Sequence, residues 1–268
     1  MIDITSLTVK EASNLLHTKQ IKAEELAKLF LERAKTLNKK LNAFITLTED
    51  KAIKSAKKVD KLISDNQKLG LLAGIPIALK DLFSTEGVKT TAASKVLENY
   101  TPVYNATVVN KLKDENTVLI GKTNLDAWAH GSSGENSDFG KTLNPYDLSR
   151  VPGGSSSGSA AAVAASLCLA ATGTDTGGSI RLPAAFCNLV GIKPTYGRVS
   201  RYGIIAMASS LDSIGHLTKT VYDNALILNT TAGHDNFDAT TSTLKPDDYT
   251  KEIEKGVKDL KIGLPREY

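Results

Sequence analysis

One serine in this sequence is placed where a nucleophilic hydroxyl would be useful. Ser179 follows Gly177 and Gly178 in the stretch TGTDTGGSIRLPAA, residues 172–185. Glycine destabilises a regular element by about 0.5–1 kcal/mol relative to alanine, so the pair indicates a positive φ or the close approach of another group. Consecutive backbone N–H groups there could converge on an oxyanion, and one such donor in a preorganised site contributes about 3–4 kcal/mol. The pattern predicts either a nucleophilic serine or a helix N-cap after a glycine turn.

A serine nucleophile needs a base, and the sequence offers a lysine for this role. Lys80 follows the apolar run 75–79, which is typical of a buried strand, whereas no histidine lies in a comparably constrained motif. Burial lowers the pKa of a lysine, and the neutral amine can then accept a proton. The alternative is an ordinary lysine at a strand end, exposed or paired with Asp81. The residue pattern alone leaves both interpretations open.

The stretch PGGSSSGSAAA, residues 152–162, allows three interpretations. A flexible linker is disfavoured, because the stretch is short and continues into an apolar helical pattern. A phosphate-binding loop is disfavoured, because the Gly-Lys-Ser/Thr ending is missing. The stretch formally contains the G-x-S-x-G pattern of a nucleophile elbow, but the preceding residues NPYDLSRVP cannot form the buried strand that an elbow requires. None of the three explains the stretch.

Three helices are expected in the N-terminal third of the chain. Thr8 and Glu11 have the spacing of a capping box at the start of the first helix, VKEASNLLHT. The second helix, at residues 22–38, and the third, EDKAIKSAKKVDKLIS, carry apolar residues at helical spacing. Their lysines indicate a solvated surface. We expect this helical segment, residues 1–66, to pack on the same domain as the rest of the chain.

Short apolar strands then alternate with helices. A strand at 75–79, a helix within NATVVNKLKDENTVLIGKTNLD, a strand at 118–120 and an alanine-rich helix at 159–169 are expected. Apolar strands separated by helices are typical of an α/β sheet that helices cover on both faces. No repeat or linker interrupts the pattern, so a single domain over residues 1–268 is expected.

Composition narrows the classes of protein that this chain could be. The 268 residues carry 33 basic and 29 acidic side chains, and the formal net charge of +4 is too mild for a nucleic-acid-binding footprint. No membrane span or leader peptide is indicated, so a cytoplasmic protein is expected. Cys168 and Cys187 lie in apolar surroundings without C-x-x-C spacing, which predicts buried thiols. The four histidines are scattered, so no metal site is expected.

Longer blocks of the sequence resemble the amidase signature family. They are AGIPIALKD, NPYDLSRVPGGSSSGSAAAVAA, GTDTGGSIRLPAAFCNLVGIKPTYGRVSRYG and ASSLDSIGHLTKTV, and with LNAFITLTED they follow the family's order along nearly the whole chain. The family's Ser–cisSer–Lys triad falls on Ser179, Ser155 and Lys80. The intervals of 75 residues between Lys80 and Ser155 and 24 residues between Ser155 and Ser179 match the family's spacing.

The resemblance implies a fold and a set of residue roles. The fold is the amidase signature fold, an α/β fold whose mixed central β-sheet is covered by helices on both faces, and the peptide bond before Ser155 is cis. Neutral Lys80 would accept a proton from Ser155, which would accept one from Ser179 as this serine attacks an amide carbonyl. The resemblance implies an oxyanion hole formed by the backbone N–H groups of Thr176, Gly177, Gly178 and Ser179. It implies that Ser156, Asp175 and Arg181 orient the triad. The implied substrate pocket contains His130, Gly131 and Ser132.

Within the family, KPTYGRVSRYG and ASSLDSIGHLTKT most resemble the branch formed by the A subunits of the glutamyl-tRNA(Gln)/aspartyl-tRNA(Asn) amidotransferases. This branch implies a glutaminase whose ammonia converts Glu-tRNA(Gln) to Gln-tRNA(Gln), or Asp-tRNA(Asn) to Asn-tRNA(Asn), in a heterotrimer with subunits B and C. Glutamine would be the substrate of this chain. No cofactor is implied here, because the partner subunit uses ATP and Mg²⁺ and makes the main contacts with the aminoacyl-tRNA.

Four positions depart from the pattern of this branch. Ala127 and His130 stand where glutamate and methionine are usual, Ser157 replaces a glycine, and His216 replaces a proline. Position 130 lies in the segment that lines the acyl pocket, so that departure bears on the choice of amide substrate.

The length of the chain also differs from that of the family, whose members are nearly twice as long. The last block, LKIGLPREY, has the pattern of a strand that begins another half, so we expect a sheet that is incomplete at its C-terminal side. Two alternatives to the glutaminase subunit therefore stand beside it. One is a free-standing amidase that hydrolyses another small amide, and the other is a catalytically impaired fragment that binds partner subunits as a scaffold.

Overall fold

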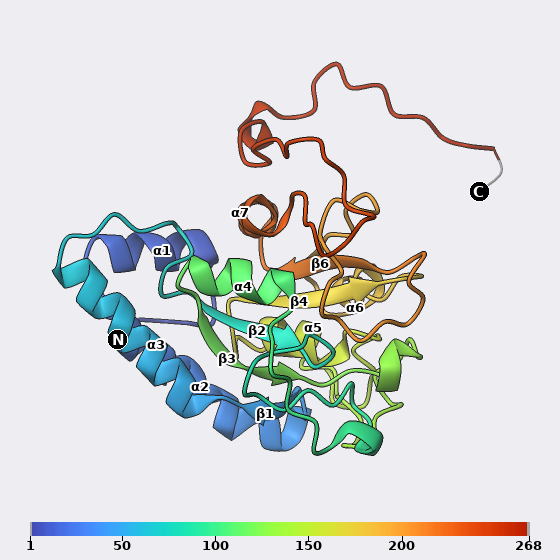
Figure 1. The fold of residues 1–268 in the computed structure, drawn as a ribbon, viewed down its shortest axis with the longest axis horizontal. Helices are drawn as coiled ribbons and strands as arrows, with labels where there is room; N and C mark the ends of the chain where they lie inside the picture. Colours follow the sequence, from blue (N-terminus) through green and yellow to red (C-terminus); the bar gives the residue numbers. More distant parts are fainter. Residues whose placement is uncertain (1, 267–268) are drawn as a thin grey trace.

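A mixed β-sheet lies at the centre of the molecule and brings distant parts of the chain together (Figure 1). The computed structural model describes residues 2–266. Within them, six strands lie in the order β1-β3-β2-β4-β6-β5, with β2 parallel to β3 and β4 and the other neighbours antiparallel. The strands are β1 (Phe44–Leu47), β2 (Pro76–Lys80), β3 (Val118–Thr123), β4 (Ala170–Asp175), β5 (Val190–Gly191) and β6 (Ser213–Thr218).

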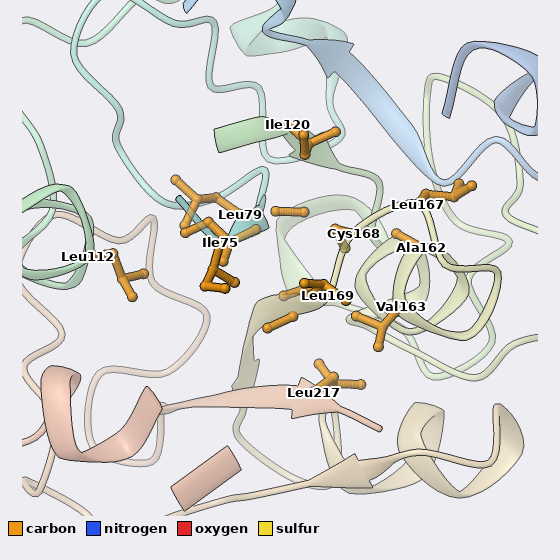
Figure 2. Close-up of a cluster of buried hydrophobic side chains, with 14 of the residues drawn as sticks. Ile75, Leu79, Leu112, Ile120, Ala162, Val163, Leu167, Cys168, Leu169 and Leu217 are labelled. Carbon is orange, nitrogen blue, oxygen red and sulfur yellow. The ribbon is translucent and has the colours of Figure 1, made fainter. Parts of the chain in front are cut away.

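Helices cover this sheet, which confirms the expected α/β fold. Helix α2 packs on α3 and β3, α5 packs on β2, β3, β4 and β6, and α7 packs on β6. Figure 2 shows buried side chains from two helices in the core: Leu112 of α4 and Val163 of α5 belong to the same hydrophobic cluster as Ile75 and Leu169. The helices are α1 (Val9–His17), α2 (Ala23–Leu41), α3 (Glu49–Ser64), α4 (Thr107–Asp114), α5 (Ser157–Ala164), α6 (Arg181–Phe186) and α7 (Val221–Thr231), with short 3₁₀ turns at Lys95–Leu97, Ala127–Ala129 and Ile253–Lys255.

The three expected N-terminal helices are confirmed. The capping box of α1 is formed, because the Glu11 N–H donates to Thr8 Oγ1 (3.2 Å) and the Thr8 N–H donates to Glu11 Oε2 (2.9 Å). Helix α2 continues to Leu41 and ends where Asn42 adopts a left-handed conformation, with φ of 51°. Leu41 is itself buried, so packing extends the helix by three residues beyond the expected end.

The alanine-rich helix α5 is shorter than expected but packs as its small residues predict. It ends at Ala164 instead of residue 169, because Ser166 takes a positive φ of 57° and the chain turns into β4. A Cβ on Gly158 would lie 2.3 Å from the carbonyl oxygen of Ala43. Glycine at this position therefore allows a close approach between α5 and the neighbouring backbone.

The C-terminal block is not the strand that we expected. Residues 260–266 are exposed and belong to no strand, and they run away from the sheet (Figure 1). A strand needs a neighbouring strand to satisfy its backbone N–H and C=O groups, and none lies beside this segment in the described part of the chain. The last two residues of the block, 267 and 268, lie outside the described residues.

The two cysteines are free and buried, as expected. Burial raises the pKa of the Cys187 thiol to about 12 and raises the pKa of the Cys168 thiol as well, so neither thiol is set up as a nucleophile. Over residues 2–266, no helix combines the length and the apolarity needed to cross a membrane.

A buried ion pair joins β3 to the residue after β2. Lys122 Nζ lies 3.2 Å from Asp81 Oδ1, and both side chains are fully buried. The ammonium also donates to the Phe83 carbonyl (2.8 Å) and to Thr90 Oγ1 (2.7 Å). Apart from this ion pair, Asp81 Oδ1 has no hydrogen-bond partner among the described residues. The ammonium of Lys122 is therefore the main group that stabilises this carboxylate oxygen.

Replacing Lys122 with methionine is expected to lower the free energy of unfolding by about 3–5 kcal/mol, because it leaves a buried carboxylate without its cation. Urea unfolding of both proteins near neutral pH measures the loss. The double variant Asp81→Asn/Lys122→Met removes both charges and should recover part of it. A loss below about 1 kcal/mol, the range of exposed pairs, would contradict this prediction.

Candidate active site

Lys80 is the last residue of β2, and its amine is buried among hydroxyl groups. Side chains alternate along a strand, so Lys80 points away from the face that carries Leu79. Its Nζ lies 2.8 Å from Ser155 Oγ, 3.0 Å from Ser156 Oγ and 2.9 Å from Thr174 Oγ1, and the side chain is fully buried. The alternative of an exposed lysine, or of one paired with Asp81, is therefore wrong.

This environment favours a neutral amine at position 80. Burial lowers the pKa of Lys80 from 10.5 to about 7, although the charges of Asp126, Asp175 and Asp212 favour the ammonium. Helix α5 begins directly after Ser156, and the positive end of its dipole also disfavours a cation there. A neutral amine has two N–H donors and one lone pair, which together match three hydroxyl partners.

Ser155 and Ser156 form the turn that precedes α5. The Gly154–Ser155 peptide bond is cis, as the resemblance implied. The Asp126 N–H donates to the Ser155 carbonyl (3.2 Å), and the Ser156 N–H donates to the Ser179 carbonyl (3.2 Å). This turn therefore joins the segment after β3 to the segment after β4.

Ser179 lies between β4 and α6 and is half-buried. Helix α6 begins at Arg181 with Ile180 as its N-cap, so the interpretation of Ser179 as an N-cap is wrong. No hydrogen bond joins Ser179 Oγ to Ser155 Oγ in residues 2–266, and the backbone bond from the Ser156 N–H to the Ser179 carbonyl links the two turns. Of the two contacts in the expected relay, the structure forms the one between Lys80 and Ser155.

Asp175, at the end of β4, holds the glycine turn in place. Its fully buried carboxylate accepts hydrogen bonds from the N–H groups of Gly178 (2.7 Å), Ile180 (3.1 Å) and Arg181 (3.2 Å). The Arg181 guanidinium donates to both oxygens, each at 3.0 Å. Burial acts to raise the pKa of Asp175, but the hydrogen bonds from Arg181 and the backbone outweigh it and lower the pKa. Asp175 and Arg181 thus orient the turn that carries Ser179.

The expected oxyanion hole needs correction at one position. The Gly178 N–H donates to Asp175, because a buried carboxylate must be satisfied by nearby donors. The N–H groups of Thr176, Gly177 and Ser179 have no partner within the described residues. Gly178 has φ of +130°, which requires glycine, whereas a Cβ on Gly177 would meet nothing within 4 Å. No protein atom requires glycine at position 177, and the space beside it is open to a ligand.

The expected pocket residues lie on the loop that follows β3. His130, Gly131 and Ser132 are exposed. The loop passes beside the cis peptide bond, since a Cβ on Gly154 would lie 3.1 Å from the carbonyl carbon of Ser132. The structure therefore places Ser132 beside the Gly154–Ser155 peptide bond, and the pocket at 130–132 stays a prediction.

Four residues of the site were missed by the sequence analysis. Thr172 accepts a hydrogen bond from the Lys80 N–H (3.0 Å), Thr174 contacts the amine, Asp212 accepts one from Thr176 Oγ1 (2.6 Å), and Asp126 acts on Lys80 by its charge. The period-two pattern of TGTDT could have placed both threonines on one face of β4. No local pattern marks the two aspartates, which the fold brings to the site.

Two of the four departures lie in the core. Ser157 donates to Thr142 Oγ1 (3.3 Å), and His216 on β6 lies within 3.3 Å of Thr231 Oγ1 on α7. Burial lowers the pKa of His216 to about 3, so its imidazole is neutral. Neither side chain contacts the amine of Lys80, so these departures do not alter its contacts.

Comparisons with known proteins agree with this geometry. A family model described as amidase matches residues 25–268. The A subunit of glutamyl-tRNA(Gln) amidotransferase from Caldanaerobacter subterraneus subsp. tengcongensis is 52% identical over all of this chain, which covers 54% of the relative. The corresponding protein from Persephonella marina is 51% identical over the whole of this chain, which covers 55% of that relative.

Solved structures show the same likeness. The crystal structure of the glutamyl-tRNA(Gln) amidotransferase A subunit from Thermotoga maritima matches 96% of this chain with a TM-score of 0.85 and 48% identity, and 53% of that structure is covered. The native peptide amidase from Stenotrophomonas maltophilia matches 91% with a TM-score of 0.87 and 39% identity, and 52% of it is covered. The chain therefore spans about half the length of the proteins that it matches.

Proposed function

Because this chain belongs to the amidase signature family, we propose that it is the glutaminase subunit of a tRNA-dependent amidotransferase. The observation that carries the proposal is the contact between the fully buried Lys80 amine and Ser155 Oγ. In the proposed site, this amine is the general base for amide hydrolysis. The 52% identity to an amidotransferase A subunit over the whole chain supports glutamine as the amide donor.

The proposed mechanism uses one proton relay in both directions. Ser179 Oγ attacks the amide carbon while its proton passes to Ser155 Oγ and the Ser155 proton passes to the neutral amine of Lys80. The oxyanion would be held by the unpartnered N–H groups of the turn at 176–179. When the C–N bond breaks, the relay returns a proton to the leaving ammonia. Water then attacks the acyl-enzyme, releases glutamate and restores the Ser179 hydroxyl.

Substrate binding has to complete this relay, since the contact from Ser155 to Ser179 is not formed in this structure. We propose that the amide, seated between the loop at 130–132 and the turn at 176–179, brings Ser179 Oγ toward Ser155. Both segments already lie beside the cis peptide bond. Apo sites often form catalytic hydrogen bonds only when the substrate is bound.

The partners and cofactors of the whole enzyme belong to the same proposal. This chain would act in the cytoplasm with subunits B and C, would carry no cofactor itself, and would pass ammonia to a partner that binds ATP, Mg²⁺ and the aminoacyl-tRNA. The single amidase domain over residues 1–268 stays a prediction. A free-standing amidase is the second candidate, and the 39% identity to a peptide amidase favours it.

Ammonia release separates these functions. The chain is assayed alone and with its partner subunits B and C, on glutamine and on benzamide, with Ser179→Ala as the control. We expect glutamine hydrolysis in the complex, stimulated by aminoacyl-tRNA and ATP and lost in Ser179→Ala. Turnover of benzamide by the chain alone would support the free-standing amidase instead. No turnover in any combination would support the scaffold.

A further inference from the structure

Asp126 connects three parts of the candidate site. It lies after β3, and its side chain is fully buried. Its Oδ1 accepts hydrogen bonds from the N–H groups of Gly134 (3.0 Å) and Asn136 (3.0 Å), and its own N–H donates to the Ser155 carbonyl (3.2 Å). One residue therefore holds the loop after β3 through its side chain and the Ser155 turn through its backbone.

Two glycines show how closely the chain surrounds this carboxylate. A Cβ on Gly154 would lie 2.0 Å from Asp126 Oδ2, and a Cβ on Gly131 would lie 2.4 Å from Asp126 Cγ. Both distances are far below van der Waals contact, so any side chain there would displace the carboxylate. The pocket loop and the cis-peptide turn thus pack against the same carboxylate from two sides.

We propose that Asp126 is a positioning residue. It fixes the loop of residues 130–136 against Ser155, and this loop then holds the substrate amide in position for the proton relay. The catalytic part of this inference rests on the proposed function, whereas the bracing of the loop does not. Asp126 positions the loop and the Ser155 turn by hydrogen bonds, and it makes no hydrogen bond to Lys80 Nζ.

The charge of Asp126 gives the proposal a signature that simple bracing lacks. It favours the ammonium form of Lys80, so the neutral variant Asp126→Asn should lower the pKa of the amine further. Reactivity of Ser179 should then persist to lower pH. The other two carboxylates whose charges act on this lysine have partners of their own. Asp175 has Arg181, and Asp212 has Thr176 Oγ1 with the N–H groups of Met207 and Ala208. Asp81, the next residue in the chain, pairs with Lys122.

Two measurements on the 268-residue chain test the proposal. The first is the rate at which a fluorophosphonate labels Ser179 between about pH 5 and about pH 9, a reaction that forms an Oγ–P bond and releases fluoride and a proton. In Asp126→Asn the ratio of the rates at pH 6 and pH 8 should rise at least about twofold. The second is amide hydrogen exchange. In Asp126→Ala the exchange of Gly134 and Asn136 should accelerate at least about tenfold.

Asp138→Asn is the matched control. Asp138 also accepts from a backbone N–H, that of Lys95 at 2.8 Å, but it is not among the charges that act on Lys80. This variant should change neither measurement. Unaltered exchange in Asp126→Ala would overturn the proposal, as would a pH profile in Asp126→Asn that stays in place or moves upward. If Ser179 of the wild type is never labelled, the proposed function fails, and exchange still decides the role of Asp126.

Discussion

Ser179→Ala is expected to remove covalent labelling by a fluorophosphonate and to lower glutamine hydrolysis by at least about 10³-fold. The variant lacks the hydroxyl oxygen that attacks the amide carbon in the proposed mechanism. Its fold should be unaffected, because Ser179 Oγ makes no hydrogen bond within the described residues and the side chain is half-buried. The free energy of unfolding should therefore change by less than about 0.5 kcal/mol.

Intact mass and peptide mass spectrometry measure the labelling. Trypsin cleaves after Arg150 and Arg181, so one peptide carries both Ser155 and Ser179, and its fragmentation assigns the labelled serine. Ser242→Ala, in the segment after α7, is a control that should label like the wild type. Label on Ser155 in place of Ser179, or labelling that persists in Ser179→Ala, would show that another residue is the nucleophile.

The parts of the site that are local in sequence could be predicted. Lys80 ends an apolar run that had to be a buried strand, and the pair Gly177–Gly178 marked a turn with unusual backbone requirements. The N-terminal helices were also predictable, since the capping box at Thr8 and the apolar spacing depend on neighbours within a few residues.

The residue pattern alone could not predict the parts of the site that depend on the fold, although the resemblance implied the roles of Ser155 and Asp175. Asp126 and Asp175 lie 49 positions apart in the sequence, yet both charges act on the same lysine, because β3 and β4 flank β2. The use of the Gly178 N–H by Asp175 follows from the burial of that carboxylate, which no local pattern reveals. The prediction of a strand in the C-terminal block was wrong for the same reason, since a segment with a strand pattern forms a strand only beside a partner strand.

Lys80→Met should reduce activity by at least about 10³-fold, because the relay then ends at Ser155 without a base. Lys80→Arg should be equally impaired, since a guanidinium stays protonated and cannot accept the proton. In the wild type, activity should fall about tenfold per pH unit below the lysine's pKa of about 7, because protonation removes the base. A profile that is flat from pH 8 to pH 5 would contradict a lysine base.

The titration of the same buried amine should also change the free energy of unfolding with pH, which can be measured without an activity assay. Its pKa is 10.5 when unfolded and about 7 when folded, so between these values the unfolded chain binds more protons and stability rises with pH. From pH 7 to pH 9 the free energy of unfolding of the wild type should rise by ~2–3 kcal/mol relative to Lys80→Met, in which this titration is absent. Urea unfolding of both proteins at the two pH values measures the difference. If the free energies of unfolding of the wild type and Lys80→Met changed equally between the two pH values, the amine at position 80 would stay protonated in the folded protein. It could then not accept the proton from Ser155.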